Sequence, residues 1–263
     1  MMRKKGRLIW MVAMLGAFML MGGCQSSGGK VKATPQPTGT ASITESANST
    51  ETANPTETAK PSDGDTTLTN LGRASIKLKL ADGRVIYIDP YAGGPSAYKE
   101  PADLVLVTHQ HDDHNRVSLC TMKDGGEIIQ CPRNMKAGDE KTSQGVKITA
   151  VAAYNKNHSA GSSCGFVLDI DGFKIYHSGD TSMVDEMKAL KDMKLDYALL
   201  CTDGYYNMGP EEAMEVAATI GAKHVIPIHS SPSGLYSQEN CDKVNLDNVV
   251  NVKLNESVSL IVK

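Results

Sequence analysis

The alternation of apolar and polar residues predicts a strand-rich domain that begins near residue 71. Apolar residues take every second position in 74–80, and an Asp82-Gly83 turn joins this segment to a second apolar run at 84–89. The pattern indicates a β-hairpin. Further short apolar runs predict strands at 104–107, 127–131, 146–153, 165–170, 173–177, 196–201, 223–228, 249–254 and 257–262.

Two segments have the spacing of helices. Residues 182–190 place apolar side chains on one face, and residues 210–220 begin with a proline and end before Gly221, as helices commonly do. Strands come first along the chain, and strands and helices alternate afterwards. This order favours an α/β (α+β) domain of two mixed sheets with helices outside over a doubly wound parallel sheet.

The first 24 residues have the pattern of an export signal. Basic residues at positions 3–7 precede an apolar stretch from Leu8 to Met21, which is short for a membrane span. Gly22-Gly23-Cys24 resembles the lipobox of bacterial lipoproteins, with Met21 where leucine is usual. The resemblance implies that Cys24 is lipidated and anchors the chain to the extracytoplasmic side of a bacterial membrane. A cleaved secretory peptide and an uncleaved anchor are the alternatives.

Residues 25–70 are rich in Thr, Ser, Pro, Ala and Gly and contain no aromatic residue. Such a segment buries too little apolar surface to offset its ordering entropy, so we expect a disordered linker. As a random coil it would span about 35–40 Å, enough to hold the domain at 71–263 away from a membrane.

Composition excludes several classes of function. The net charge is −3 with both signs interspersed, which gives no footprint for nucleic acid. There is neither a GxGxxG nor a Walker A pattern, so nucleotide binding has no support. The five cysteines after Cys24 show no CxxC spacing. Some could pair in an exported protein, but buried free thiols fit the apolar strands around Cys131, Cys164 and Cys201 better.

Residues 108–114, THQHDDH, directly follow the predicted strand at 104–107. His109 and His111 are two positions apart, so in extended backbone their side chains leave on the same side. His114 requires a turn first, and Asp113 points away from both. The arrangement suits two adjacent metal ions, one with the histidine pair and one with Asp113 and His114. These ligand types suit zinc, manganese or iron.

Three more residues follow predicted strands. They are His158, Asp180 and His229. Alone, each would be interpreted as a loop histidine, a helix-capping aspartate and a core histidine. Together with residues 109–114 they form a set of metal-ligand types gathered at strand ends.

This set is similar to the metallo-β-lactamase superfamily, over nearly all of residues 74–263. The HxHxDH pattern, Gly179-Asp180-Thr181, the MGPEEA run at 208–213 and the VIPIH run at 225–229 resemble its ascorbate-6-phosphate lactonase-like branch. The resemblance implies a four-layer αββα sandwich with the site at one edge of the paired sheets. It implies two divalent ions, zinc more than manganese or iron, although some members work with one. The first metal would be held by His109, His111 and His158, and the second by Asp113, His114 and His229, with Asp180 bridging.

The implied activity is hydrolysis of a small ester, lactone or phosphodiester by a metal-bound hydroxide, with Asp113 orienting the hydroxide and moving the proton. Metallo-β-lactamases resemble this chain in the first motif but lack an aspartate at the place of Asp180, which disfavours a β-lactam substrate. A β-lactam hydrolase and a surface-anchored metal-binding protein without turnover are the alternatives. Residues that could support the metal or line the pocket are His177, Asp203, Tyr154 and Asn155, for which core packing or an ordinary loop role stays open. Related enzymes often have an aromatic residue after the last histidine, where this chain has Ser230-Ser231-Pro232. Substrate identity and oligomeric state do not follow from the sequence.

Overall fold

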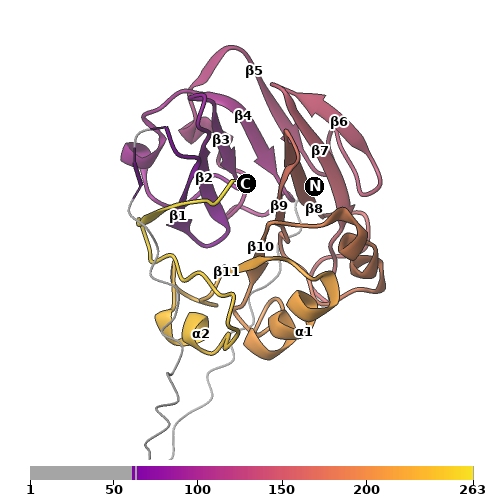
Figure 1. The fold of residues 1–263 in the computed structure, drawn as a ribbon. Coiled ribbons are helices and arrows are strands. Elements are labelled where there is room, and N and C mark those ends of the chain that lie inside the picture. The colour runs from indigo at the N-terminus through magenta and orange to yellow at the C-terminus, as the bar shows by residue number, and fades with distance from the viewer. Residues whose placement is uncertain (1–60, 63, 263) are drawn as a thin grey trace, which may run out of the picture. The chain divides into compact units, whose positions relative to one another are not determined.

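Two six-stranded mixed sheets form the centre of the computed structural model, which describes residues 61, 62 and 64–262 (Figure 1). The export signal at 1–24, with Cys24, and the linker as far as residue 60 lie outside the described residues. The first sheet has the order β12-β1-β2-β3-β4-β5. Its strands are β12 (Ser257–Ser259), β1 (Thr67–Gly72), β2 (Ser75–Lys79), β3 (Val85–Ile88), β4 (Ala102–Val107) and β5 (Met122–Gln130).

The second sheet has the order β11-β10-β9-β8-β7-β6. Its strands are β11 (His224–Ile228), β10 (Tyr197–Cys201), β9 (Phe173–His177), β8 (Cys164–Ile170), β7 (Val146–Ala152) and β6 (Glu140–Ser143). The helical elements are the 3₁₀ segments η1 (Pro95–Tyr98), η2 (Val117–Leu119) and η3 (Asp185–Met193) and the α-helices α1 (Pro210–Ile220) and α2 (Gln238–Asp242).

Three apolar clusters define the layers of the sandwich. The largest lies between the sheets and joins residues such as Leu104 of the first to Phe166 and Leu199 of the second. A second cluster packs the outer face of the second sheet against η3 and α1. A third packs the outer face of the first sheet around Tyr87 and Tyr98 and reaches η2. The arrangement confirms the expected α/β sandwich of two mixed sheets, and in the described residues the third cluster covers the first sheet with the 3₁₀ segments η1 and η2.

β4 shows why its sequence is a continuous apolar run. Leu104 and Leu106 point into the core between the sheets, whereas Val105 and Val107 belong to the outer cluster. A strand covered on both faces has no position for an alternating polar residue. β4 pairs in parallel with β3 and β5, so its carboxyl end opens at the same edge as theirs.

The folded part of the chain begins before residue 71. Residues 67–70, which were expected in the linker, form most of β1, which pairs with both β2 and β12. Leu68 is fully buried, and the Asn70 amide donates to the carbonyl of Val252 at 2.8 Å. The threonines and the asparagine make this strand look like linker, although its alternate side chains face the core.

Other differences concern short or exposed elements. The segment at 182–190 forms the later 3₁₀ segment η3, and residues 249–254 contribute an isolated bridge between Val249 and Val225 in place of a strand. The edge strand β6 and helix α2 had no apolar pattern that predicts them. α1 has the expected bounds.

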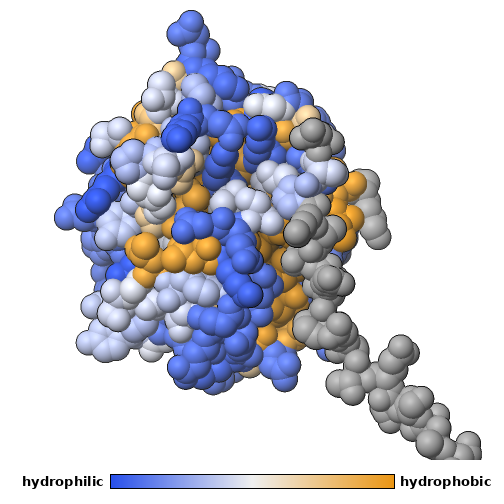
Figure 2. All heavy atoms as spheres, turned by 90° about the vertical axis from the view of Figure 1, so that its left-hand side faces the viewer, coloured by the Kyte–Doolittle hydropathy of each residue, from blue (hydrophilic) through white to orange (hydrophobic). Residues whose placement is uncertain are grey.

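Five cysteines are free among the described residues, and four of them are buried, including the three for which a buried thiol was expected. No helix in the described part of the chain has the length and apolarity needed to cross a membrane. On the face shown in Figure 2, hydrophilic residues cover most of the surface and apolar residues appear in narrow strips between them.

Candidate metal centre

The loop after β4 is held by a buried carboxylate on the neighbouring strand. Asp89, at the end of β3, accepts hydrogen bonds from the backbone N–H and the hydroxyl of Thr108, both at 2.7 Å. The N–H of His114 then donates to the carbonyl of His111 at 3.0 Å, which makes the turn expected between them. The strand ends and the loop therefore aim three imidazoles at one place.

Three imidazoles form the first group of candidate ligands. Nδ1 of His111 lies 3.1 Å from Nε2 of His109 and 3.1 Å from Nε2 of His158. His158 arrives from the loop after β7, 47 residues away from His111 in the chain. The three nitrogen atoms converge as ligands of one cation do.

Asp113, His114 and His229 form a second group. The carboxylate of Asp113 lies 3.8 Å from Nε2 of His114 through Oδ1 and 3.8 Å from Nε2 of His229 through Oδ2. His229 comes directly after β11, on the opposite sheet, so this group joins the two sheets.

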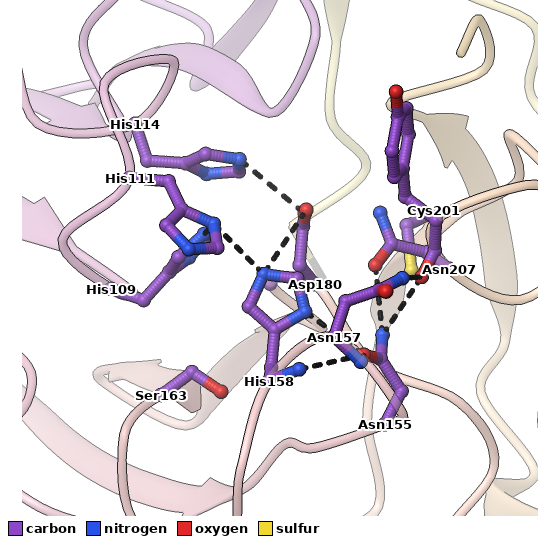
Figure 3. A network of polar contacts seen from close by, with 12 residues as sticks. His109, His111, His114, Asn155, Asn157, His158, Ser163, Asp180, Cys201 and Asn207 are labelled. Carbon is purple, nitrogen blue, oxygen red and sulfur yellow. Dashed lines mark hydrogen bonds and ion pairs between the residues drawn. The ribbon is translucent and has the colours of Figure 1, made fainter. Parts of the chain in front are cut away.

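Asp180 contacts members of both groups, and Figure 3 shows its carboxylate beside His114 and His158. Its carboxylate is 3.5 Å from His114 Nε2, 3.6 Å from His229 Nε2 and 3.9 Å from His158 Nε2. The structure thus brings together all seven residues that the sequence analysis proposed as ligands and gives Asp180 the central place between the two groups.

Unpaired polar atoms test whether these residues suit metal ions. Nε2 of His114, Nε2 of His229 and Oδ1 of Asp180 are buried without a hydrogen-bond partner. Leaving such atoms unpaired costs about 1–3 kcal/mol each. Because all three are metal-ligating atoms that face one another, the donor set fits divalent cations.

The outer nitrogens of three histidines face hydrogen-bond partners that fix their orientation. Nδ1 of His114 lies 2.8 Å from Asp89, that of His158 lies 3.0 Å from the amide oxygen of Asn155, and that of His109 lies 3.1 Å from the Thr108 hydroxyl. These contacts place the Nδ1 proton outward and leave Nε2 for the cluster, the usual arrangement of metal-binding histidines. Asp203 lies 3.2 Å from Nδ1 of His229 as an ion-pair contact without hydrogen-bond geometry.

Burial and charge set the protonation of the two groups in opposite ways. Burial, together with the neighbouring His114, lowers the pKa of His109 to about 3, and burial also lowers the pKa of His158. Burial alone would lower the pKa of His229, but Asp180 and Asp113 outweigh it and raise that pKa to about 9. His109 and His158 are therefore neutral at pH 7, whereas His114 and His229 of the second group carry protons in the absence of a cation.

Burial favours the neutral carboxyl of Asp180, but His229 and His114 outweigh it and hold its pKa well below the usual range. The same opposition holds for Asp113, whose pKa is lowered by His229 and His114 against the effect of burial. Both carboxylates are ionised at neutral pH, as ligands must be.

A cavity of about 360 Å³ opens onto the cluster. It exposes His111, Asp113, His158, Asp180 and His229, so both candidate groups are accessible to a small molecule. Its remaining walls are formed by Arg73, Asn157, Tyr206 and Pro232.

The supporting residues expected from the sequence take different places. Asn155 and Asp203 contact ligand histidines from outside, as described above. His177 is fully buried, and its Nε2 lies 3.0 Å from the carbonyl of Ala74 while its Nδ1 accepts from the N–H of Gly179. It therefore holds the turn that carries Asp180. Tyr154 does not line the cavity, because its hydroxyl donates to Glu186 of η3.

Asp89 and Arg73 are parts of the site that the sequence analysis did not identify. Asp89 had a detectable signal, since it is an acidic residue directly after a buried strand that precedes the metal-loop strand. Arg73 had none, because it lies in the tight connection between β1 and β2, and β1 was expected to be linker.

Known proteins are similar to much of this chain. Residues 67–229 match the family described as Beta-lactamase superfamily domain. A UPF0173 metal-dependent hydrolase of Methanoculleus marisnigri is 35% identical over 181 residues, covering 62% of this chain and 80% of the relative. One from Thermus thermophilus is 31% identical over 183 residues, covering 60% and 81%. The crystal structure of a candidate metal-dependent hydrolase from Parabacteroides distasonis has a TM-score of 0.63 and 28% identity, covering 75% of this chain and 98% of that one.

Proposed function

The chain belongs to the beta-lactamase superfamily and is a metal-dependent hydrolase, and from this premise we propose that it cleaves a small ester, lactone or phosphodiester at a centre of two divalent ions. The observation that carries the proposal is the pair of His/Asp groups on either side of Asp180, with unpaired buried ligand atoms facing one another. Zinc is the proposed metal, with manganese and iron as alternatives.

In this proposal His109, His111 and His158 would hold the first ion, Asp113, His114 and His229 would hold the second, and Asp180 would be available to both. When bound, such a pair of ions lowers the pKa of a water molecule towards neutrality and polarises the group to be cleaved. The volume of the cavity, about 360 Å³, suits a substrate of small-molecule size.

Asp113 is the proposed catalytic residue. Its side chain is 31% exposed, far more than the 5% of Asp180, and it lines the cavity. An ionised carboxylate in this position can accept a hydrogen bond from the attacking water, orient it, and take up its proton. Asp89, Asp203 and Asn155 keep the ligand imidazoles in the required orientation.

The metal centre is tested by elemental analysis of the purified full-length chain beside a His111→Ala variant. We expect about two equivalents of metal in the wild type and a clear loss in the variant. His224→Gln is the matched control, because this histidine stacks on Tyr197 outside the cluster and its loss should leave the metal content unchanged. Absence of metal after reconstitution of the wild type would refute the proposed centre.

Turnover is tested with Asp113→Asn on a panel of lactones, esters and phosphodiesters. The variant keeps an oxygen ligand but is a poor proton acceptor, so we expect retained metal and a loss of rate of about 100-fold or more. Equal inactivity of a metal-loaded wild type and this variant across the panel would favour a metal-binding protein without turnover.

We further propose that the chain is exported and anchored to a membrane by a lipid on Cys24, with the hydrolase domain on the extracytoplasmic side. The support is the basic and apolar pattern of residues 3–21 followed by Gly22-Gly23-Cys24. In bacterial cells given a labelled fatty acid, the wild type should incorporate label and partition into detergent, and Cys24→Ser should not. Unlabelled wild type would exclude lipidation.

A further inference from the structure

Arg73 is the only cationic side chain other than the histidines among the described residues that line the cavity. It sits in the connection between β1 and β2, and its side chain is 15% exposed. No role in holding metal falls to a guanidinium, so its place beside two ligand groups requires a different explanation.

The backbone of Arg73 is fastened to the last ligand strand. Its carbonyl accepts from the N–H of His229 at 2.8 Å, and its own N–H donates to the carbonyl of Leu235 at 2.7 Å. Its φ is 51°, a left-handed conformation that costs a bulky residue about 1–3 kcal/mol and persists where the surroundings impose it. The Cα of Arg73 is thus fixed relative to the metal centre.

One edge of the guanidinium is fixed as well. Nη1 donates to the carbonyl of Ser231 at 2.9 Å, in the Ser-Ser-Pro segment where the sequence departs from related enzymes. With the backbone and Nη1 both fixed, the plane of the group is set before any ligand arrives.

The other edge has no hydrogen-bond partner. Nε is buried without one, and Nη2 donates to no described residue. The nearest carboxylate oxygen, Oδ2 of Asp113, is 3.8 Å from Nε, which is too long for a hydrogen bond. Asp113 also has two histidines at the same distance, so Arg73 is not needed to neutralise it.

We propose that Arg73 binds an anionic group of the substrate, a carboxylate or a phosphate, through the side of its guanidinium that does not bond to Ser231. The guanidinium holds its N–H donors in one plane, which suits the oxygens of such an anion. This inference rests on the proposed hydrolase function and narrows its substrates to negatively charged small molecules.

Another part of the cavity lining fits a substrate with an additional apolar or hydroxylated part. Tyr206 lines the cavity and is 45% exposed, and its carbonyl accepts hydrogen bonds from the amides of Asn155 and Asn157. Its backbone is thus held in place, while the ring, which packs edge-on against Tyr205, stays partly exposed.

The test compares a charged and a neutral substrate of equal shape on the metal-loaded, full-length chain. Mono-p-nitrophenyl succinate and p-nitrophenyl levulinate differ in a carboxylate replaced by a methyl ketone. We expect Arg73→Gln to lower kcat/KM for the succinate ester by about 10- to 100-fold, with little effect on the levulinate ester. Arg73→Lys should give a partial loss, because it keeps the charge without the fork.

Arg84→Gln is the control. Arg84, like Arg73, donates to a backbone carbonyl, that of Gln144, and it also pairs with Asp82, but it lies outside the cavity lining. It should not change the ratio of the two rates. An equal loss on both esters in Arg73→Gln, or a loss of metal, would overturn the proposal and assign Arg73 a role through Asp113 or the fold.

Inhibition by succinate and by glycerol phosphate distinguishes the two anions, since the inhibitor that Arg73→Gln weakens more identifies the group that Arg73 binds. If the metal-loaded wild type cleaves neither ester, the proposed activity fails on these substrates, and calorimetric titration with the same two anions still decides the inference. Weaker binding in Arg73→Gln of at least one anion supports it, and unchanged binding of both refutes it.

Discussion

Asp89 is the residue on which the first ligand loop depends. Its carboxylate is fully buried, and it accepts two hydrogen bonds from Thr108 and one from Nδ1 of His114. Burial favours its neutral form, but His114 and His177 outweigh that and lower its pKa. One side chain therefore fixes the exit of β4 and the orientation of a candidate ligand.

Replacing this carboxylate should weaken metal binding without removing a ligand. Asp89→Asn replaces one of the two carboxylate oxygens by an NH₂ group, which donates and does not accept. Either one of the hydrogen bonds from Thr108 is lost, or the NH₂ group faces the Nδ1–H of His114. We expect zinc affinity, measured by competition with a chelator, to fall about 10- to 100-fold.

Asp103→Asn is the matched control, because Asp103 also accepts from a backbone N–H, that of Val85, far from the cluster. Its zinc affinity should equal that of the wild type. Wild-type affinity in Asp89→Asn would show that the orientation of His114 is set by other contacts.

At the level of elements, the turn after β9 requires a glycine at position 179. Gly179 has a φ of 60°, and a Cβ there would lie 3.0 Å from the carbonyl oxygen of Cys164 and 3.0 Å from Cβ of Thr108. The turn carrying Asp180 can approach the turn after β4 only because no side chain stands between them.

Gly179→Ala should therefore both destabilise the fold and displace Asp180. The left-handed φ alone costs about 1–2 kcal/mol, and the close contacts add to it. Gly221→Ala separates these effects, since its φ is 65° but a Cβ there meets nothing within 4 Å. Thermal unfolding and metal content measured on both variants should show a larger loss in Gly179→Ala and a loss of metal only there. Equal behaviour of the two variants would mean that the crowding is relieved by small shifts.

The sequence predicts the central elements of this fold because their patterns are strong. β4 is an uninterrupted apolar run, and α1 has both a starting proline and a closing glycine. β1 was missed because its polar alternate residues, such as Asn70, are satisfied by distant partners such as the carbonyl of Val252. Long-range pairing of that kind leaves no local signal.

The candidate ligands were predictable for a related reason. Metal chemistry restricts them to histidine and aspartate at strand ends, so residue type and position suffice. The contribution of Arg73 depends on which edge of its guanidinium is occupied, which only the folded arrangement determines. Tyr154 was expected as a pocket residue because of its place in the sequence, but in the folded chain its hydroxyl donates to Glu186 of η3.

For the whole molecule, the charged groups of the metal-free centre set the pH dependence of stability. His229, with a folded pKa of about 9, stabilises the fold fully below its unfolded pKa of about 6.5, and this contribution is lost as pH rises towards 9. His109, with a folded pKa of about 3, has the opposite sign, because the unfolded chain binds the proton more readily and stability falls as pH drops from 6.5 to 3.

The chelated protein should therefore have its highest melting temperature near pH 6.5 and lose stability on both sides. With zinc bound, the decline between pH 6.5 and 9 should disappear, because the metal replaces the proton shared by the second group. Melting curves in chelator and in zinc across this range provide the measurement. An unchanged melting temperature of the chelated protein between pH 6.5 and 9 would contradict the assignment of raised pKa values to the second group.

The position of His229 at the far end of the ligand set has a consequence for biosynthesis. During synthesis His109, His111, Asp113 and His114 leave the ribosome long before β11 is made. The hydrogen bond from the N–H of His229 to the carbonyl of Arg73 can form only afterwards. A growing chain can offer a cation only a partial set of ligands. All seven candidate ligands are together only after β11 has joined the second sheet, so under the proposed function the metal would be acquired where the chain finishes folding.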